Sequence, residues 1–237
     1  MQVSIIVPVF NEALLIRPFL SNLRERTPGA EIIVVDGAST DGTERLAQGF
    51  SDRVIQTEAR SRATQMNAGA KAASGDVFWF LHADGAVPKE SLDEIARIMR
   101  SPKVCGGFFR IRLPATPVVY RLTDSFAHYA GLVLRMRCGD HGMFCRRTAF
   151  VETGGFPDVP LMEDVEFFRR LRHCGRIVHS NKRIAVSPRR YEIVGPARLT
   201  LAYGMIATLY EFGVPFERLA QVYQRTCCVK EAASSSK

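Results

Sequence analysis

The stretch Val77-Phe-Trp-Phe-Leu-His-Ala-Asp84 decides the fold. Its first five residues, 77–81, are all apolar, a run too short for a helix and apolar on both faces. This pattern is typical of a strand buried in the middle of a mostly parallel sheet. Ligands of open α/β sheets bind at the carboxyl ends of the strands, which is where Asp84 would lie. Its carboxylate suits Mg²⁺ or Mn²⁺, and a simple turn at Asp84-Gly85 is the alternative.

Strands and helices alternate through the first hundred residues. Apolar runs predict buried strands at 3–7, 31–35, 54–56 and 77–81. Apolar residues at helical spacing, and an alanine-rich segment, predict helices at 13–26, 43–50, 61–73 and 89–100. This alternation predicts an α/β, doubly wound and mostly parallel sheet with right-handed crossovers.

The pattern changes after residue 104. Residues 106–113 alternate like an antiparallel strand, and short strands are predicted at 142–146 and 184–187. Helices are predicted at 116–134, 148–153, 163–173 and 199–224, the last interrupted near Gly213 and Pro215. We therefore expect a small antiparallel part and a helical C-terminus, followed by a disordered tail at 231–237.

The composition is that of a soluble or peripheral globular protein. The chain has 237 residues, 46% of them hydrophobic and 24% charged, and a net charge of +8. That charge suits nucleic acid, an anionic membrane or an anionic substrate, and nucleic acid is the weakest of the three because no motif for it is present. The six cysteines form no zinc-like spacing, which indicates reduced, structural thiols in the cytoplasm. The start of the chain has no pattern of a signal peptide, and the longest near-apolar run, 199–209, is too short to span a bilayer.

Asp36 repeats the geometry of Asp84, because it also follows a buried strand directly. Its acceptor-only side chain fits the imide N–H of a uracil or a ribose hydroxyl. Ser39 and Thr40 are expected to cap the next helix. The chain has neither a Gly-x-Gly-x-x-Gly turn nor a Gly-Lys-Ser/Thr loop, which argues against dinucleotide and P-loop folds.

Four motifs together resemble family 2 glycosyltransferases of the GT-A (nucleotide-diphospho-sugar transferase) fold. They are the first strand with Pro8-Val-Phe-Asn-Glu12, Asp36-Gly-Ala-Ser-Thr-Asp-Gly-Thr43, the aspartate-tipped strand at 77–84, and Glu163-Asp164. The segment 60–70, the His82-Ala-Asp84 triplet and residues 155–164 resemble a small bacterial subfamily with a His-Ala-Asp metal motif. The resemblance covers roughly residues 2–190.

The resemblance implies a set of donor-binding residues in the first half of the chain. The positions that match nucleotide-binding positions of the family are Pro8, Phe10, Glu12, Asp36, Arg62, Asn67, His82 and Asp84. Asp84 matches the last aspartate of the Asp-x-Asp metal motif, and His82 stands at its first position. A single carboxylate is therefore left for Mn²⁺ or Mg²⁺, and His82 could instead hydrogen-bond ribose or phosphate.

The resemblance also implies catalytic residues in the second half. Asp164 matches the base that takes the acceptor hydroxyl's proton in an inverting transfer. Glu163 is its neighbour on the same predicted helix, and only one of the two is expected to act. Asp140 and His141 are expected on the acceptor side, and Arg189 and Arg190 in a flexible segment that closes over the diphosphate.

The sequence thus predicts a metal-assisted, inverting glycosyltransferase with a nucleotide-sugar donor, UDP-linked by preference, and an unknown hydroxyl acceptor. Residues 1–103 would form the nucleotide-sugar half and 104–190 the acceptor half of one domain, followed by a helical segment at 191–230. That segment could pack on the sheet, on a second subunit in a homodimer, or on the inner face of a membrane, which would suit a lipid-linked acceptor. The alternative function is a catalytically silent nucleotide-sugar-binding or scaffold protein.

Overall fold

The computed structural model describes residues 1–58, 60–112 and 141–227, without the side chain of Arg190. The predicted helix at 116–134, the predicted tail at 231–237 and the candidate residue Asp140 lie outside the described residues.

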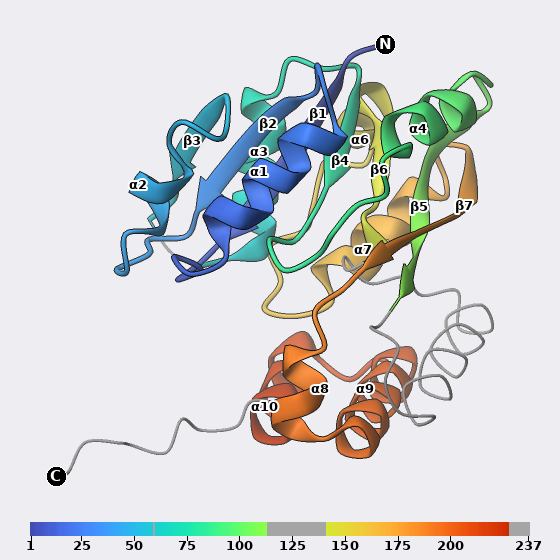
Figure 1. The fold of residues 1–237 in the computed structure, drawn as a ribbon. Helices are drawn as coiled ribbons and strands as arrows, with labels where there is room; N and C mark the ends of the chain where they lie inside the picture. Colours follow the sequence, from blue (N-terminus) through green and yellow to red (C-terminus); the bar gives the residue numbers. More distant parts are fainter. Residues whose placement is uncertain (59, 113–140, 228–237) are drawn as a thin grey trace, which may run out of the picture.

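Seven strands of the described residues form one sheet (Figure 1) in the order β3-β2-β1-β4-β6-β5-β7. They are β1 (Val3–Val9), β2 (Glu31–Asp36), β3 (Arg53–Gln56), β4 (Val77–Phe80), β5 (Val104–Arg112), β6 (Phe144–Arg146) and β7 (Arg176–Ala185). Within this described sheet, β6 runs antiparallel to both neighbours and every other pairing is parallel. The predicted α/β fold with a small antiparallel part is therefore confirmed.

Helices cover both faces of the sheet. The elements are α1 (Ile16–Arg26), α2 (Thr43–Ala47), α3 (Arg62–Ala72), α4 (Ser91–Met99), α6 (Arg147–Glu152) and α7 (Glu163–Leu171). One core joins the sheet to α1 and α4, and a second joins it to α3, α6 and α7. Ile5 and Ile6 of β1 are both fully buried but belong to opposite cores, as the two-residue period of a strand requires.

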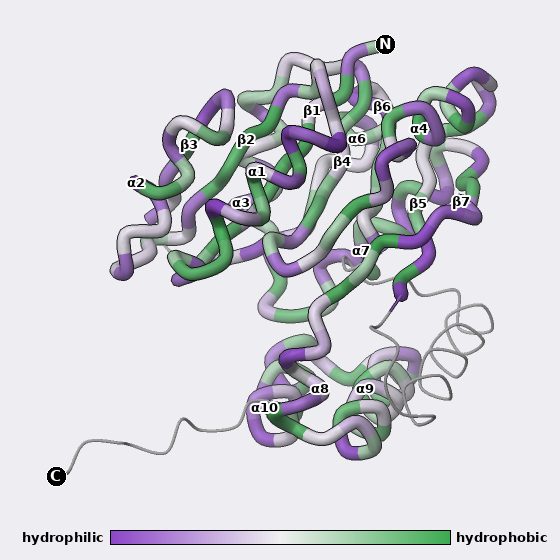
Figure 2. Tube along the Cα trace, in the orientation of Figure 1, coloured by the Kyte–Doolittle hydropathy of each residue, from purple (hydrophilic) through white to green (hydrophobic). Residues whose placement is uncertain are grey.

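The strand β4 lies at the centre of the sheet, as its sequence predicts. All four of its residues are buried, and it pairs with β1 on one side and β6 on the other. The buried Trp79 indole N–H donates to the Gly142 carbonyl at 3.0 Å, which satisfies its polar atom. In Figure 2, green hydrophobic segments are frequent along the central strands of the sheet.

Two strands are longer than predicted. β1 extends to Val9, so Pro8 lies in the strand opposite Val35 and not in the loop after it. β7 begins at Arg176, eight residues before the predicted start at residue 184. Its outer position explains the error, because an edge strand exposed along much of its length carries polar residues (Figure 2) and no apolar run. Residues 104–112 form β5, which is antiparallel to β6 as expected but parallel to β7.

The C-terminal helices α8 (Arg189–Val194), α9 (Pro196–Glu211) and α10 (Phe216–Cys227) gather below the sheet in Figure 1. The break near Gly213 and Pro215 is confirmed, whereas α8 starts two residues before the predicted helical segment at 191–230 and was not predicted as a separate helix. Leu199, Ile206 and Leu219 pack in a third core that also takes in Val165 of α7. This third core attaches the C-terminal helices to α7.

Polar contacts strengthen the attachment of α9 to α7. The Tyr210 hydroxyl donates to the Glu166 carboxylate, and Arg169 forms an ion pair with Glu211. Burial, and then the neighbouring Glu166 carboxylate, raise the pKa of the Tyr210 hydroxyl. Among the described helices, none combines the length and the hydropathy needed to cross a bilayer.

The described cysteines are free thiols, as expected from their spacing: Cys105, Cys145, Cys174 and Cys227. Burial raises the pKa of Cys105 to about 11 and that of Cys145 well above its usual range. These two side chains are therefore protonated and unreactive at neutral pH, and they serve the packing of the core.

Candidate active site

The loops that follow β1 and β2 are joined along the carboxyl edge of the sheet. Three backbone N–H groups of the first loop donate to side-chain oxygens of the second: Asn11 to Ser39 at 2.8 Å, Glu12 to Thr43 at 2.8 Å and Ala13 to Asp41 at 3.0 Å. Asn11 holds a left-handed backbone conformation, with a φ of 53°. These bonds fix the position of one loop relative to the other.

The predicted capping role of Ser39 and Thr40 is wrong. The N-cap of α2 is Gly42, and the backbone N–H of Thr43, the first residue of the helix, donates to Asp41 Oδ1 at 3.0 Å. The Ser39 hydroxyl is instead the acceptor for Asn11, and the Thr40 backbone N–H donates to the Asn11 side chain at 3.0 Å. The polar residues after β2 therefore connect two loops.

Asp36 is buried at the end of β2, with no solvent exposure. Its Oδ1 accepts the Ser39 backbone N–H at 2.7 Å, in a turn that includes Ala38 at a φ of 65°. Among the described residues, Asp36 Oδ2 is the one buried side-chain oxygen or nitrogen without a hydrogen-bond partner. A buried carboxylate oxygen in this state is an acceptor in need of a donor, since leaving it unpaired costs about 1–3 kcal/mol.

Gln65 supports this edge from α3, and sequence reasoning missed it. The side chain is 2% exposed, and its amide donates to the backbone carbonyls of Val9 and Val35, both at 2.8 Å. A Cβ on Gly37 would lie 3.1 Å from the same amide, so the turn after β2 leaves little space there. A glutamine among the alanines of a buried helix face was the available signal.

Phe10, directly after β1, is half-buried, and Arg62 is exposed. The Arg60 guanidinium stands over the Phe10 ring, 4.7 Å from its centre. Arg62 is exposed at the first turn of α3, directly after the N-cap Ser61. Arg60 thus stands beside the end of β1, and its guanidinium group suits an anionic ligand there.

Acidic residues and Arg189 face one another near the end of β4. Asp84 is exposed, in a loop tied to β7 by two backbone hydrogen bonds between Ala86 and Ala185, at 2.8 and 2.9 Å. Burial raises the pKa of Glu12, the Asp84 carboxylate raises it further, and Arg189 opposes the shift. An Arg189 nitrogen lies 3.9 Å from the Glu12 carboxylate.

Arg189 and Arg190 were expected in a flexible segment, but the structure has a helix there. Both residues belong to the backbone of α8, a regular helix that opens the C-terminal unit. The Arg189 side chain is exposed and reaches the donor side from there. Arg190 stays a prediction, since its side chain is not described.

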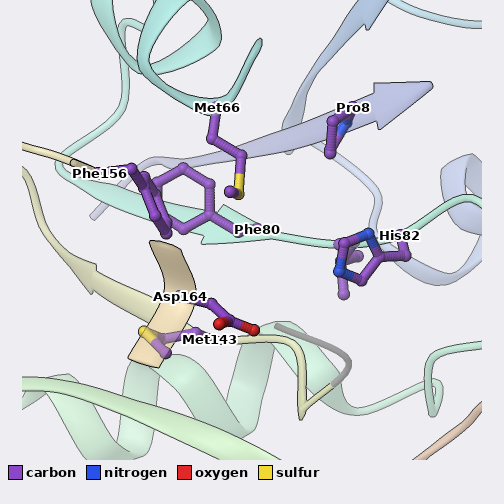
Figure 3. A pocket seen from close by; sticks show the side chains of 8 residues that line it. Pro8, Met66, Phe80, His82, Met143, Phe156 and Asp164 are labelled. Carbon is purple, nitrogen blue, oxygen red and sulfur yellow. The ribbon is translucent and has the colours of Figure 1, made fainter. Parts of the chain in front are cut away.

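A pocket brings His82 and Asp164 together (Figure 3). It is lined by Pro8, Met66, Phe80, Leu81, His82, Met143, Phe156 and Asp164. In Figure 3 the Asp164 carboxylate, from the start of α7, and the His82 ring, from the loop after β4, face the same space. Leu81 and His82 also line a second pocket that contains Asp84. The carboxylates after β4 and at α7 are therefore reached from adjoining hollows.

Glu163 and Asp164 diverge at the first turn of α7. The helix starts after Met162, whose φ is 71°. Glu163 is 7% exposed, whereas Asp164 lines the pocket and accepts the Val165 backbone N–H at 2.8 Å. Val165 points into the third core. Of the two acids, the structure leaves Asp164 facing the open space.

Two further candidates contact the protein itself. Both polar atoms of the Asn67 side chain bond to the Phe156 backbone, at 2.8 and 2.9 Å, so Asn67 faces that loop. His141 places its Nδ1 3.2 Å from the Phe109 carbonyl, beside β5. Its expected partner on the acceptor side, Asp140, lies outside the described residues.

The donor set at this edge fits a metal that also uses ligand oxygens. Within residues 1–58, 60–112 and 141–227, no three His, Cys, Asp or Glu side chains gather as a complete metal site. The Asp84 carboxylate is exposed, with the His82 ring two residues before it. Mg²⁺ commonly binds one or two carboxylates and completes its shell with phosphate oxygens and water.

The sheet, with Asp36 and Asp84 after β2 and β4 and Asp164 at the same edge, defines a GT-A fold. Solved structures agree with this class. The mannosyltransferase PcManGT from Pyrobaculum calidifontis, in complex with GDP-Man and Mn²⁺, superposes with a TM-score of 0.67 at 22% identity, over 94% of this chain and 69% of the other. Glucosyl-3-phosphoglycerate synthase from Mycobacterium tuberculosis, with Mn²⁺ and UDP, gives 0.62 at 19% identity, over 90% and 81%.

Comparison of the sequence with known proteins identifies one family among proteins of the GT-A fold. The family model of glycosyl transferase family 2 matches residues 4–151. Glycosyltransferase AglE from Haloferax volcanii is 27% identical over 188 residues, which are 73% of this chain and 62% of that protein. The chain thus spans less than two thirds of the length of this relative. It belongs to glycosyl transferase family 2.

Proposed function

We propose that the chain transfers a sugar from a nucleotide-sugar donor, preferably UDP-linked, to a hydroxyl acceptor with inversion at the anomeric carbon. The observation that carries the proposal is the sharing of His82 and Leu81 by two pockets, one containing Asp84 and the other Asp164. This arrangement sets the Asp84 carboxylate, a candidate metal ligand, and the Asp164 carboxylate, the candidate base, on either side of one wall. Family membership and the donor complexes of the similar structures support it.

Donor binding would use the joined loops after β1 and β2. The unpartnered Oδ2 of Asp36 would accept the imide N–H of the uracil ring. Arg62 and Arg189 carry exposed guanidinium groups that would meet the diphosphate. Pro8 and Phe10 would contribute packing surfaces at the end of β1.

Asp164 would act as the base. Its carboxylate would take the proton of the acceptor hydroxyl as that oxygen bonds to the anomeric carbon, while the bond from that carbon to the diphosphate oxygen breaks. A hydrolase mechanism would need two carboxyl groups flanking the scissile bond, and the buried Glu163 is not available as the second.

Asp84 would hold Mn²⁺ or Mg²⁺ together with the donor's phosphate oxygens, with His82 beside them. When bound, the metal supplies positive charge that stabilises the leaving diphosphate. Arg189 would add to this charge from α8, because its guanidinium already lies at the acidic cluster.

A thermal-shift panel of nucleoside diphosphates and nucleotide sugars, with and without Mn²⁺, tests the proposal. A ligand at 100 times its Kd should add about 2.7 kcal/mol of stability. We expect a shift with UDP that grows with Mn²⁺ and loses the metal dependence in Asp84→Ala. A larger shift with GDP would move the donor class to guanine nucleotides, and no shift with any nucleotide would refute the proposal.

A catalytically silent nucleotide-sugar binder is the second candidate, favoured by His82 at the first metal position. It predicts the same thermal shifts but no transfer of labelled sugar to any acceptor. Wild-type transfer that is lost in Asp164→Asn would exclude it.

We also propose that the C-terminal helices meet an anionic membrane surface at the inner face, in keeping with a lipid-linked acceptor. Leu201 and Met205 on α9 and Phe212 at its C-cap are 74, 43 and 82% exposed, while Leu199 and Ile206 pack inward. Flotation with anionic liposomes should be reduced by Phe212→Ser. Binding that is unchanged by this substitution would refute the contact, and concentration-dependent dimers would assign the face to a second subunit.

A further inference from the structure

We propose that Asn67 is a positioning residue that holds the Asp164 carboxylate in the pocket by fixing the backbone of Phe156. The inference rests on the proposed function, because Asn67 would act through Asp164, the proposed base. It also moves Asn67 from the donor side to the catalytic side.

The Asn67 side-chain amide makes two hydrogen bonds to the backbone of Phe156, one with its nitrogen and one with its oxygen. Asn67 Nδ2 donates to the Phe156 carbonyl at 2.8 Å, and the Phe156 N–H donates to Asn67 Oδ1 at 2.9 Å. The two residues are 89 positions apart in the sequence. A paired amide contact of this kind mimics one rung of a β-ladder, so it fixes the orientation of the Phe156 peptide groups as well as their position.

The loop around this contact has little freedom to shift. Gly155, directly before Phe156, has a φ of 75°, and a Cβ there would lie 2.6 Å from Asn67 Oδ1. The loop ends at Met162, which is also left-handed, with a φ of 71°. Glycine adopts a positive φ without a steric cost, but the left-handed conformation of Met162 costs free energy and persists only where other contacts enforce it.

The Phe156 ring packs between the loop and α7, so it fixes the position of α7 relative to the loop. It stacks on Phe167 with ring centres 4.2 Å apart and an interplanar angle of 29°, and it meets Phe80 edge-on at 4.9 Å. Phe167 lies three residues after Asp164, so both sit on adjacent turns of one helix. Phe156 and Asp164 also line the same pocket (Figure 3).

Kinetics of Asn67→Ala test the role. Misplacing a reacting group by about 1 Å can cost on the order of 100-fold. We therefore expect kcat for sugar transfer to fall roughly 10- to 100-fold. The donor KM and the Kd of UDP should be unchanged. Asn22→Ala makes the same change on α1, whose residues pack on the opposite face of the sheet, and should leave kcat unaltered. Weaker UDP binding in Asn67→Ala would overturn the proposal in favour of a nucleotide contact.

A double-mutant cycle separates positioning from general support of the fold. If Asn67 acts through Asp164, adding Asn67→Ala to Asp164→Asn should cost no further activity. A fully additive loss would overturn the positioning role.

Amide hydrogen exchange gives a readout that does not depend on transfer. Residues 156–162 should exchange faster in Asn67→Ala than in the wild type or Asn22→Ala, and equal exchange would overturn the contact's importance. If the wild type transfers no sugar at all, the proposed function fails while the exchange result still decides whether Asn67 holds the loop.

Discussion

The loops after β1 and β2, proposed to form the donor side, and α7, proposed to form the catalytic side, are held in place by different means. On the donor side, short polar segments after β1 and β2 bond to each other, and Gln65 links the ends of the two strands. On the catalytic side, α7 depends on packing with distant parts of the chain: Phe156 on one face and the C-terminal helices on the other.

This difference indicates how each side responds to change. Substitutions in the donor loops act on a few hydrogen bonds and should be felt locally. Substitutions in the C-terminal core reach Asp164 through its neighbour Val165, although the core itself contains no proposed catalytic residue. The predictions below run from the largest expected effect to the smallest.

Asp164→Asn should have the largest effect, and that effect should be on turnover and not on UDP binding. Loss of a positioned base typically lowers turnover by about 10²–10⁴-fold, whereas UDP binding should not change. Steady-state kinetics measure the turnover, and calorimetric titrations with UDP measure the binding. Retention of full turnover would assign the base elsewhere.

Leu199→Ala should disturb the catalytic side from a distance. Leu199 is fully buried in the third core, and such truncations cost about 2–5 kcal/mol. We expect a lower free energy of unfolding in urea and reduced kcat, with UDP affinity preserved in the folded fraction. Leu201→Ala, on the exposed side of the same helix, is the matched control and should stay within about 0.5 kcal/mol. Equal effects at the two positions would contradict the comparison.

Asp36→Asn should weaken the donor side alone. A hydrogen bond to a charged group contributes roughly 1.5–3 kcal/mol, so UDP affinity should fall about 10- to 100-fold. The exposed Asp93→Asn on α4 controls for the charge change. An unchanged Kd for UDP would show that Asp36 Oδ2 does not meet the nucleotide.

Glu12→Gln should give the smallest effect, visible as a pH dependence. Burial and the Asp84 charge raise the pKa of Glu12 above its ordinary 4.5. The stability contributed by its protonated form is therefore fully present below pH 4.5 and is lost as the pH rises through the raised folded value. Since glutamine stays neutral, Glu12→Gln should have the higher Tm at pH 7, and the difference should vanish near pH 4. Thermal unfolding across this range, with Glu25→Gln as the exposed control, checks the sign; a constant difference would contradict it.

The sequence predicts the central part of the fold well because burial there leaves a clear pattern. The five apolar residues at 77–81 locate β4, and the acids after the apolar runs predict Asp36 and Asp84 at the carboxyl ends of β2 and β4. The same reasoning fails for β7, whose outer position permits polar residues. It also fails for α8, because six residues are too few to show a helical period, although Tyr191 and Val194 pack against the third core.

Contacts between distant segments were harder to predict than elements. The sequence places Asn67 and Gln65 on α3 but contains no sign that one bonds to Phe156 and the other to Val9 and Val35. Likewise Ser39 is a good capping residue by type, and only the neighbouring loop reveals its partner, Asn11. Such bonds depend on the packing of the finished sheet.

Under the proposed donor contact, the unpartnered oxygen of Asp36 would make the stability of the protein depend on the concentration of its nucleotide ligand. An empty binding site leaves that acceptor unpaired in the interior, and a bound nucleotide would pair it and stabilise the native state. In a cell, a protein with a larger unfolded fraction is degraded faster. We therefore expect the abundance of this protein to fall when nucleotide sugars are scarce, without any change in its synthesis.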